Sequence, residues 1–340
     1  MLSTQIVSSM VKIRLIWADS LKGVLILLVL LGHAIQYTIG EACYTNHLWN
    51  MIYSFHMPAF MAVSGFLAYK VEGAGPLLST IWRRFQQLMI PYLSWSFLII
   101  LIDGNFNVGR IQELILFPDK GLWFLWVLFF IIVIFNLCGW IAEKLKVNMA
   151  FIVFMIGLPL VLFTVFCKIK LLGIQFIAYY FIFYASAYYF HKYYDKFATV
   201  KSWLLALLGA IWGFLAWFWQ MHEIPSFLAW IPIPATIVQY MYRFITAFIA
   251  IYVLLVLSPQ VLDTNSKWNI PMMIIGKLSL GVYSINFFVL GHIVPLMKES
   301  GLSESMTILF SFIMGSICAW VIIWVLAQWR FTARCLLGKV

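Results

Sequence analysis

Charged side chains are scarce in this chain. Of its 340 residues only 10% are Asp, Glu, Lys or Arg, whereas 64% are hydrophobic, and the mean hydropathy is +0.98. Soluble domains carry about 25% charged and about 45–50% apolar residues, so the composition excludes a water-soluble globule, a disordered chain and a nucleic-acid-binding protein. No polar stretch is long enough for a separate soluble domain. We therefore expect residues 1–340 to form a single membrane-embedded domain.

The motifs of several enzyme and transporter classes are also absent. The sequence contains no phosphate-binding P-loop, no HExxH zinc motif and no GxSxG nucleophile elbow. The cysteines have the spacing of neither a metal site nor a disulfide framework; they are Cys43, Cys138, Cys167, Cys318 and Cys335. These absences argue against ATP-driven transport and zinc proteolysis, and we expect no metal cofactor.

Long apolar runs occupy most of the sequence. Crossing about 30 Å of hydrocarbon takes about 20 helical residues, and ten runs separated by charged residues, Pro and Gly approach that length. The sequence therefore predicts an all-α integral membrane protein, a polytopic bundle of about ten transmembrane helices. The predicted spans are 17–39, 48–69, 86–102, 121–140, 149–167, 171–190, 202–220, 235–257, 271–296 and 305–328.

The basic residues predict the orientation of these spans. The net charge is +10, and sixteen of the 22 Lys and Arg residues fall on the side of the N-terminus. Because cytoplasmic loops are enriched in Lys and Arg, both termini should be cytoplasmic. Lys12, Arg14, Lys70, Lys267 and Lys339 are among the sixteen. The opposite side has only Arg110, Lys120, Lys168, Lys170 and Lys298, and Arg243 lies inside a span.

Three polar residues interrupt the first span. Asp19 lies one turn before Lys22, and His33 follows Lys22 by eleven residues. On a helix, Lys22 and His33 lie within about 20° of the same face and about 16 Å apart along the axis. Ionisable groups in hydrocarbon are costly and commonly functional. The alternative from spacing alone is that Asp19 and Lys22 are interfacial anchors and His33 is a hydrogen-bonded packing residue.

Further polar residues occur in the second and third predicted spans. His56 is close to Pro58, which removes a backbone donor and favours a bend. The small residues from Ser64 onward allow a neighbouring helix to approach closely. His56 therefore suggests a cavity wall, or equally a hydrogen-bonded histidine near the outer interface. Arg83 and Arg84 form a basic pair before the third span, which indicates either phosphate binding or the cytoplasmic side alone.

Two later spans also carry polar residues at membrane depth. Arg243 lies too deep to reach the interface easily, so we expect a buried acidic partner or an anionic ligand. Gly276, Ser279, Tyr283 and Asn286 recur at spacings of three, four and three, which predicts one polar helix face. Packing of small residues between helices is the alternative explanation for this second pattern.

An ordered set of short motifs runs through almost the whole chain. The set comprises Asp19-Ser20-Leu21-Lys22-Gly23 with Gly32-His33, Phe55-His56-Met57-Pro58 with Ser64-Gly65-Phe66, Trp82-Arg83-Arg84 with Pro91-Tyr92, Leu122-Trp123-Phe124-Leu125, and Gly276-Lys277-Leu278-Ser279-Leu280-Gly281-Val282-Tyr283. In this combination the chain resembles the membrane acyltransferase-3 family, in particular its branch of fucose 4-O-acetylase-like sugar acetyltransferases.

The resemblance implies a function and a location. Members of this family acylate hydroxyls of cell-envelope glycans, lipid-linked sugars and exopolysaccharides, with cytoplasmic acyl-CoA as the usual donor. A membrane O-acetyltransferase of the bacterial inner membrane is therefore expected, with acetyl-CoA as donor and no extra periplasmic domain. The family's first-span hallmark, a basic residue followed by ten residues and a histidine, falls on Lys22 and His33. Where the family often has a later histidine, this chain has Asn286, which cannot exchange a proton near neutral pH.

The same resemblance suggests roles for individual residues. His33 is the expected general base, or a transient carrier of the acetyl group, with Asp19 orienting Lys22. Lys22, Arg83 and Arg84 would meet the CoA phosphates. The candidates for the acceptor side or the oxyanion site are His56, Ser64, Arg243, Ser279 and Tyr283. The rival class is a secondary transporter or flippase that uses intramembrane His and Arg, although the broken-helix symmetry of such proteins is not evident.

Overall fold

The computed structural model confirms the predicted all-helical architecture. It describes residues 15–69, 76–102, 104, 107–167, 169–262 and 269–339, and every regular element within these ranges is a helix. The α-helices of the first half are α1 (Ile16–Ile39), α2 (His47–Tyr53), α3 (His56–Phe66), α4 (Leu77–Arg84), α5 (Ile90–Ile102), α6 (Val108–Leu116), α7 (Trp123–Leu145) and α8 (Met149–Phe166). Those of the second half are α9 (Ile174–Lys192), α10 (Tyr194–Phe197), α11 (Ser202–Trp217), α12 (Ala235–Leu262), α13 (Asn269–Lys277), α14 (Ser279–Glu299), α15 (Glu304–Leu326) and α16 (Arg330–Leu337).

Short segments of tighter or wider helix connect these elements. They are the 3-10 turns η2 (Gly40–Thr45), η4 (Pro118–Lys120), η5 (Leu171–Gly173) and η6 (Ser226–Leu228), and the π-helix η3 (Phe85–Met89). The π-helix joins α4 to α5 without a break and comes just before Pro91. Because Pro91 has no N–H to donate to the Gln87 carbonyl, the α-helical hydrogen-bond ladder is interrupted here and the backbone widens.

The chain is a multi-pass membrane protein. Within the described residues, eight helical segments have the length and composition needed to cross a membrane. They include α1 with its 3-10 extension, α4 through α5, α7, α8, α9 with η5, α12, α14 and α15. A total of ten requires that α11 and the α2–α3 pair cross as well, which stays a prediction. The cytoplasmic location of both termini also stays a prediction, and Lys12, Arg14, Lys70, Lys168 and Lys267 lie outside the described residues.

Two of the predicted spans are not continuous helices. Residues 48–69 form α2 and α3, separated by a turn at Ser54 and Phe55. Pro58 lies in the first turn of α3, where a missing backbone N–H costs nothing, so the proline follows a helix start and does not bend a longer helix. Residues 271–296 are likewise divided at Leu278 into α13 and α14. Hydropathy alone does not show such breaks because both halves are apolar.

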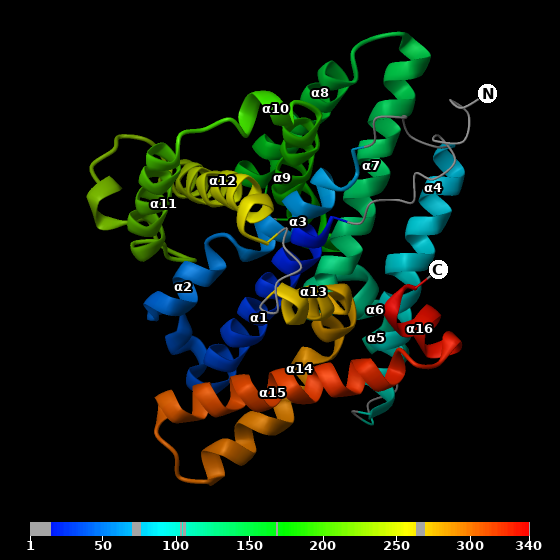
Figure 1. Cartoon of the computed structure of the whole chain (residues 1–340), viewed down its shortest axis with the longest axis vertical. Helices are drawn as coiled ribbons and strands as arrows, with labels where there is room; N and C mark the ends of the chain where they lie inside the picture. The colour runs from blue at the N-terminus through cyan, green and yellow to red at the C-terminus, as the bar shows by residue number, and fades with distance from the viewer. Residues whose placement is uncertain are drawn as a thin grey trace, which may run out of the picture.

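The first helix runs through the middle of the bundle (Figure 1) and contacts α3, α12, α13, α14 and α15. Its closest partner is α13, where two glycines let the backbones touch. A Cβ on Gly276 would lie 1.7 Å from the carbonyl oxygen of Asp19, and one on Gly23 would lie 2.1 Å from that of Met272. The predicted packing of small residues is therefore present at Gly276, and it fixes the polar start of α1 against the end of α13.

Candidate functional site

A cavity of about 520 Å³ opens at the start of α1, and we call it the basic cavity. Its walls come from α1, α3, the α4–η3 junction, α7, the α13–α14 junction and the residues after α16. Four cationic side chains and one carboxylate line it: Lys22, Arg84, Lys277 and Lys339, with Asp19. The excess of positive charge suits an anionic ligand that carries phosphate groups.

Asp19 and Lys22 meet as the helical spacing predicts. Lys22 Nζ lies 3.0 Å from Asp19 Oδ1, with 26% of the lysine side chain and 5% of the aspartate side chain exposed. The carboxylate is therefore buried, while the ammonium is partly exposed at the cavity wall. The ion pair holds the lysine side chain at the cavity wall.

The two neighbouring arginines at the end of α4 face different surroundings. Arg84 lines the basic cavity and donates from Nη1 to Gln87 Oε1 at 2.9 Å, and Gln87 lines the cavity as well. Arg83 is partly exposed and is not among the lining residues. Neighbouring helical positions point about 100° apart, so only one member of the pair can face the cavity. π-turns occur frequently at functional sites.

The last described residues close one side of the basic cavity. Trp95 Nε1 donates to the carbonyl oxygen of Leu336 at 2.8 Å, which anchors α16 to α5. Gly338 follows with a φ of +61°, and a Cβ there would lie 2.1 Å from the carbonyl oxygen of Gln87. The left-handed turn and this close approach both require glycine. They bring Lys339 to the cavity wall.

Three of the predicted acceptor-side residues also line this cavity. Ser64 and Ser279 are partly exposed, and Ser64 Oγ donates to the Phe60 carbonyl oxygen at 2.9 Å. Tyr283 is buried, and its hydroxyl oxygen accepts from the Phe124 backbone N–H at 3.2 Å. The rings of Phe124 and Tyr283 contact edge to face, with centroids 5.6 Å apart. The Tyr283 hydroxyl proton therefore remains available to a bound group, because its oxygen acts as the acceptor in that bond.

His33 and His56 lie together but outside the basic cavity. Tyr53 connects them, with ring centroids 6.5 Å from His33 and 4.7 Å from His56. His33 Nδ1 lies 3.3 Å from Gln36 Oε1, and the Tyr53 hydroxyl donates to the same oxygen at 3.4 Å. With Nδ1 donating to this amide oxygen, the lone pair of His33 is on Nε2.

His56 is held more rigidly than His33. Its Nδ1 donates to the backbone carbonyl oxygen of Ile52 at 2.7 Å, and the side chain is buried. The bond closes the turn between α2 and α3. His56 therefore has a structural role, because its side chain stabilises this turn.

Arg243 is surrounded by aromatic rings. It is neither a lining residue of the basic cavity nor part of the group formed by His33, Tyr53 and His56. Its guanidinium carbon is 5.3 Å from the ring centroid of Tyr179, 5.5 Å from that of Trp219 and 5.6 Å from that of Tyr240. Of the ion pairs found within the described ranges, none involves Arg243, so the expected acidic partner is replaced there by cation–π contacts.

Three polar lining residues were not predicted as site residues from the sequence. Lys277 lies inside the Gly276–Tyr283 motif and was counted only among the basic residues of the cytoplasmic side. Gln87 carries no charge and follows the arginine pair. Lys339 is more than 300 residues from Lys22 in the sequence, so only the tertiary fold brings them to one cavity. Across the described part of the chain, no cluster of His, Cys, Asp and Glu is able to hold a metal ion.

Comparison with known proteins gives one family and two relatives. A family model described as an acyltransferase domain matches residues 15–326. The protein called "Nodulation protein NolL" in Mesorhizobium japonicum is 30% identical over 158 residues, 39% of this chain and 40% of the relative. Its namesake in Sinorhizobium fredii is 37% identical over 124 residues, 32% of each chain. The chain thus matches less than half the length of these curated relatives, and no solved structure matches it.

Proposed function

We infer that, because the chain belongs to the acyltransferase family whose domain covers residues 15–326, this membrane acyltransferase transfers an acetyl group from acetyl-CoA to a sugar hydroxyl. The acceptor class is a cell-envelope glycan, a lipid-linked sugar or an exopolysaccharide. The membrane is the bacterial inner membrane, and the donor approaches from the cytoplasm. The whole chain acts as one membrane-embedded catalytic domain.

The basic cavity is the observation that carries this proposal. Coenzyme A is strongly anionic, and a cavity lined by Lys22, Arg84, Lys277 and Lys339 offers charge-assisted hydrogen bonds to its phosphates. Arg84 offers a planar fork, and the three lysines offer mobile point charges. The apolar residues deeper in the cavity, among them Phe60 and Leu128, suit the uncharged acyl arm.

His33 is the proposed general base. In the transfer step the sugar oxygen bonds to the acetyl carbonyl carbon and the carbon–sulfur bond of the thioester breaks. The hydroxyl proton passes to Nε2 of His33, and the sulfur leaves as a thiolate that takes up a proton. The hydroxyl of Tyr283, one turn before Phe287 on α14, is the proposed donor to the oxyanion that forms on the carbonyl oxygen. Ser279, and Ser64 whose hydroxyl already donates to Phe60, are proposed to contact the donor arm or the acceptor instead.

The position of His33 adds a requirement to this mechanism. Along α1, His33 is seven residues, about 10 Å, beyond Ile26, the last α1 residue of the basic cavity. Tyr283 is the last α14 residue that lines the cavity, and we expect the Phe124 ring packed against it to move aside and admit the acyl arm. Neither His56 nor Arg243 lines the basic cavity. Both are proposed to act at the acceptor side by positioning the tyrosine rings that they contact.

A deletion strain tests this function directly. Envelope glycans from the parent strain should carry the mass increment of one acetyl group on residues that lack it in the deletion strain. Complementation with the wild-type gene should restore the increment. Identical glycan spectra in the two strains, with the protein present in the parent membrane, would contradict the proposal.

A further inference from the structure

A second cavity, of about 560 Å³, lies beside α6, and we call it the α6 cavity. It occupies the other end of the helices that line the basic cavity. On α1 the cavity is lined by Tyr37, which is fifteen residues and about 22 Å along the axis from Lys22. On α14 it is lined by Phe287, which lies one turn beyond Tyr283. The two cavities therefore enter the bundle from opposite directions.

His33 lies between the two cavities. Its ring centroid is 4.3 Å from that of Phe287, which lines the α6 cavity. On α1 it lies four residues before Tyr37 and seven after Ile26. On α14, Phe287 lies one turn beyond Tyr283, which lines the basic cavity. A group that approaches His33 from the α6 cavity therefore meets the Phe287 ring first.

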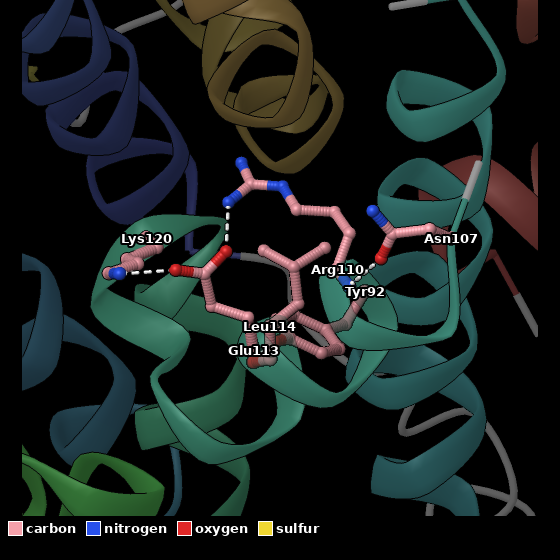
Figure 2. A network of polar contacts seen from close by, with 6 residues as sticks. All are labelled: Tyr92, Asn107, Arg110, Glu113, Leu114 and Lys120. Atoms are coloured by element: carbon pink, nitrogen blue, oxygen red, sulfur yellow. Dashed lines mark hydrogen bonds and ion pairs between the residues drawn. The ribbon is translucent and has the colours of Figure 1, made fainter. Parts of the chain in front are cut away.

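The rim of the α6 cavity is polar but electrically balanced. Figure 2 shows Glu113 between Arg110 and Lys120, with Arg110 Nη1 2.5 Å from Glu113 Oε2 and Lys120 Nζ on the other carboxylate oxygen. Asp119 lines the same cavity, and its Oδ1 has no hydrogen-bond partner among the described residues. Two cations and one carboxylate thus line this cavity, and Glu113 behind them pairs with both cations and offsets their charge. The basic cavity has four cations and a single carboxylate.

The rim is also fixed in place. Asn107 caps α6 by accepting at Oδ1 from the Arg110 backbone N–H at 2.7 Å. The Tyr92 hydroxyl donates to the Leu114 carbonyl oxygen at 2.7 Å and anchors α6 to α5 (Figure 2). Preorganised polar groups around an apolar floor are typical of small-molecule sites.

We propose that the α6 cavity binds the acceptor as an uncharged, hydroxyl-bearing sugar ring that enters from the face opposite to the donor. The Tyr37 and Phe287 rings, with centroids 6.4 Å apart, offer an apolar surface to the C–H face of a sugar. Tyr37 is 37% exposed and therefore reachable. Asp119, Asn107 and Lys120 offer acceptors and donors to hydroxyl groups. Balanced charge favours a neutral ring over a phosphate-bearing ligand. This inference rests on the proposed function.

The test separates the two substrates kinetically. Purified protein transfers radiolabelled acetyl from acetyl-CoA to envelope glycan of the host strain that has been deacetylated with mild alkali. Asp119→Asn and Tyr37→Leu should each raise KM for this glycan about tenfold or more and leave KM for acetyl-CoA unchanged. Glu304→Gln, at an exposed site on α15, is the matched control and should change neither constant.

Unchanged donor kinetics also show that the variants are folded. If wild type transfers label and both α6-cavity variants keep the wild-type KM for glycan, the assignment of this cavity is wrong and the proposed function stands. If the variants raise both constants together, the cavity is not specific to the acceptor and the assignment is again wrong. If wild type transfers no label to the glycan, the proposed function fails and this inference fails with it.

Discussion

At the scale of single residues, Arg84 and Arg83 form a natural pair of test and control. Only Arg84 lines the basic cavity, where it is held by Gln87. Arg84→Gln should raise KM for acetyl-CoA by about 10- to 150-fold, because a charge-assisted hydrogen bond contributes about 1.5–3 kcal/mol. Turnover should change much less. Steady-state kinetics of the purified variants provide the measurement, and Arg83→Gln should match wild type. Equal effects of the two substitutions would show that general positive charge, and not cavity contact, determines donor affinity.

His33 carries the chemistry in the proposed mechanism. His33→Gln keeps a hydrogen-bonding side chain of similar reach and removes the proton acceptor. Acetyl transfer should fall by about 100- to 10,000-fold, the range that general-base catalysis supplies. Binding of acetyl-CoA, measured on the same sample, should persist because His33 lies outside the basic cavity. Transfer at the wild-type rate would make His33 a packing residue.

At the scale of elements, the crossing of α1 and α13 positions the start of α1. Gly276→Ala would place a Cβ 1.7 Å from the Asp19 carbonyl oxygen, so the two backbones must separate. Overpacking of this kind costs about 1–3 kcal/mol or more. We expect a melting temperature in detergent several degrees below wild type, together with a raised KM for acetyl-CoA because Asp19 and Lys22 move.

A second glycine provides the control for that experiment. A Cβ added to Gly209, inside α11, would meet no atom within 4 Å, so Gly209→Ala should leave the melting temperature unchanged or raise it slightly. A Gly276→Ala protein that melts with wild type would show that the α1–α13 contact is looser than described.

The α6 rim should respond to pH through Glu113. Hydrogen bonds from Lys120 and Arg110 hold the pKa of this carboxyl below its ordinary value of 4.5. A lowered folded-state pKa means that the stabilisation is fully present above the ordinary value and is lost as the pH falls through the folded-state pKa. A spin label at Gln112→Cys should therefore be immobile at neutral pH and become mobile in acid. Adding Glu113→Gln should make the label mobile at neutral pH. If the label has the same mobility in both proteins at every pH, the ion pairs of Glu113 with Arg110 and Lys120 do not hold α6 in position.

How far each element could be predicted depends on the kind of interaction that forms it. The Asp19–Lys22 pair follows from helix geometry, because residues three apart share a face. The break between α2 and α3 depends on two residues, Ser54 and Phe55, that hydropathy does not distinguish from their neighbours. The choice of Arg84 over Arg83 depends on how α4 is rotated against its neighbours, which the sequence alone leaves open.

At the scale of the whole molecule, the sequence could predict membrane embedding and the family but not which distant residues share a cavity. Apolar composition is a property of each segment, and the structure confirms the all-helical outcome. Lys339 meets Lys22 only because Trp95 anchors α16 and Gly338 turns the chain back toward Gln87. His33, predicted on the face of Lys22 and about 16 Å further along α1, contacts Tyr53 and Phe287 beyond the cavity that Lys22 lines.

Acetyl transfer by the isolated molecule is the most direct test of the central claim. Purified protein in sealed liposomes is given radiolabelled acetyl-CoA on the side of the basic cavity and alkali-deacetylated envelope glycan on both sides. We predict that label becomes covalently attached to the glycan and is released again by mild alkali, as an O-acetyl ester requires. Label that stays on CoA, or that crosses the membrane without joining the glycan, would contradict an acetyltransferase and point to a transporter.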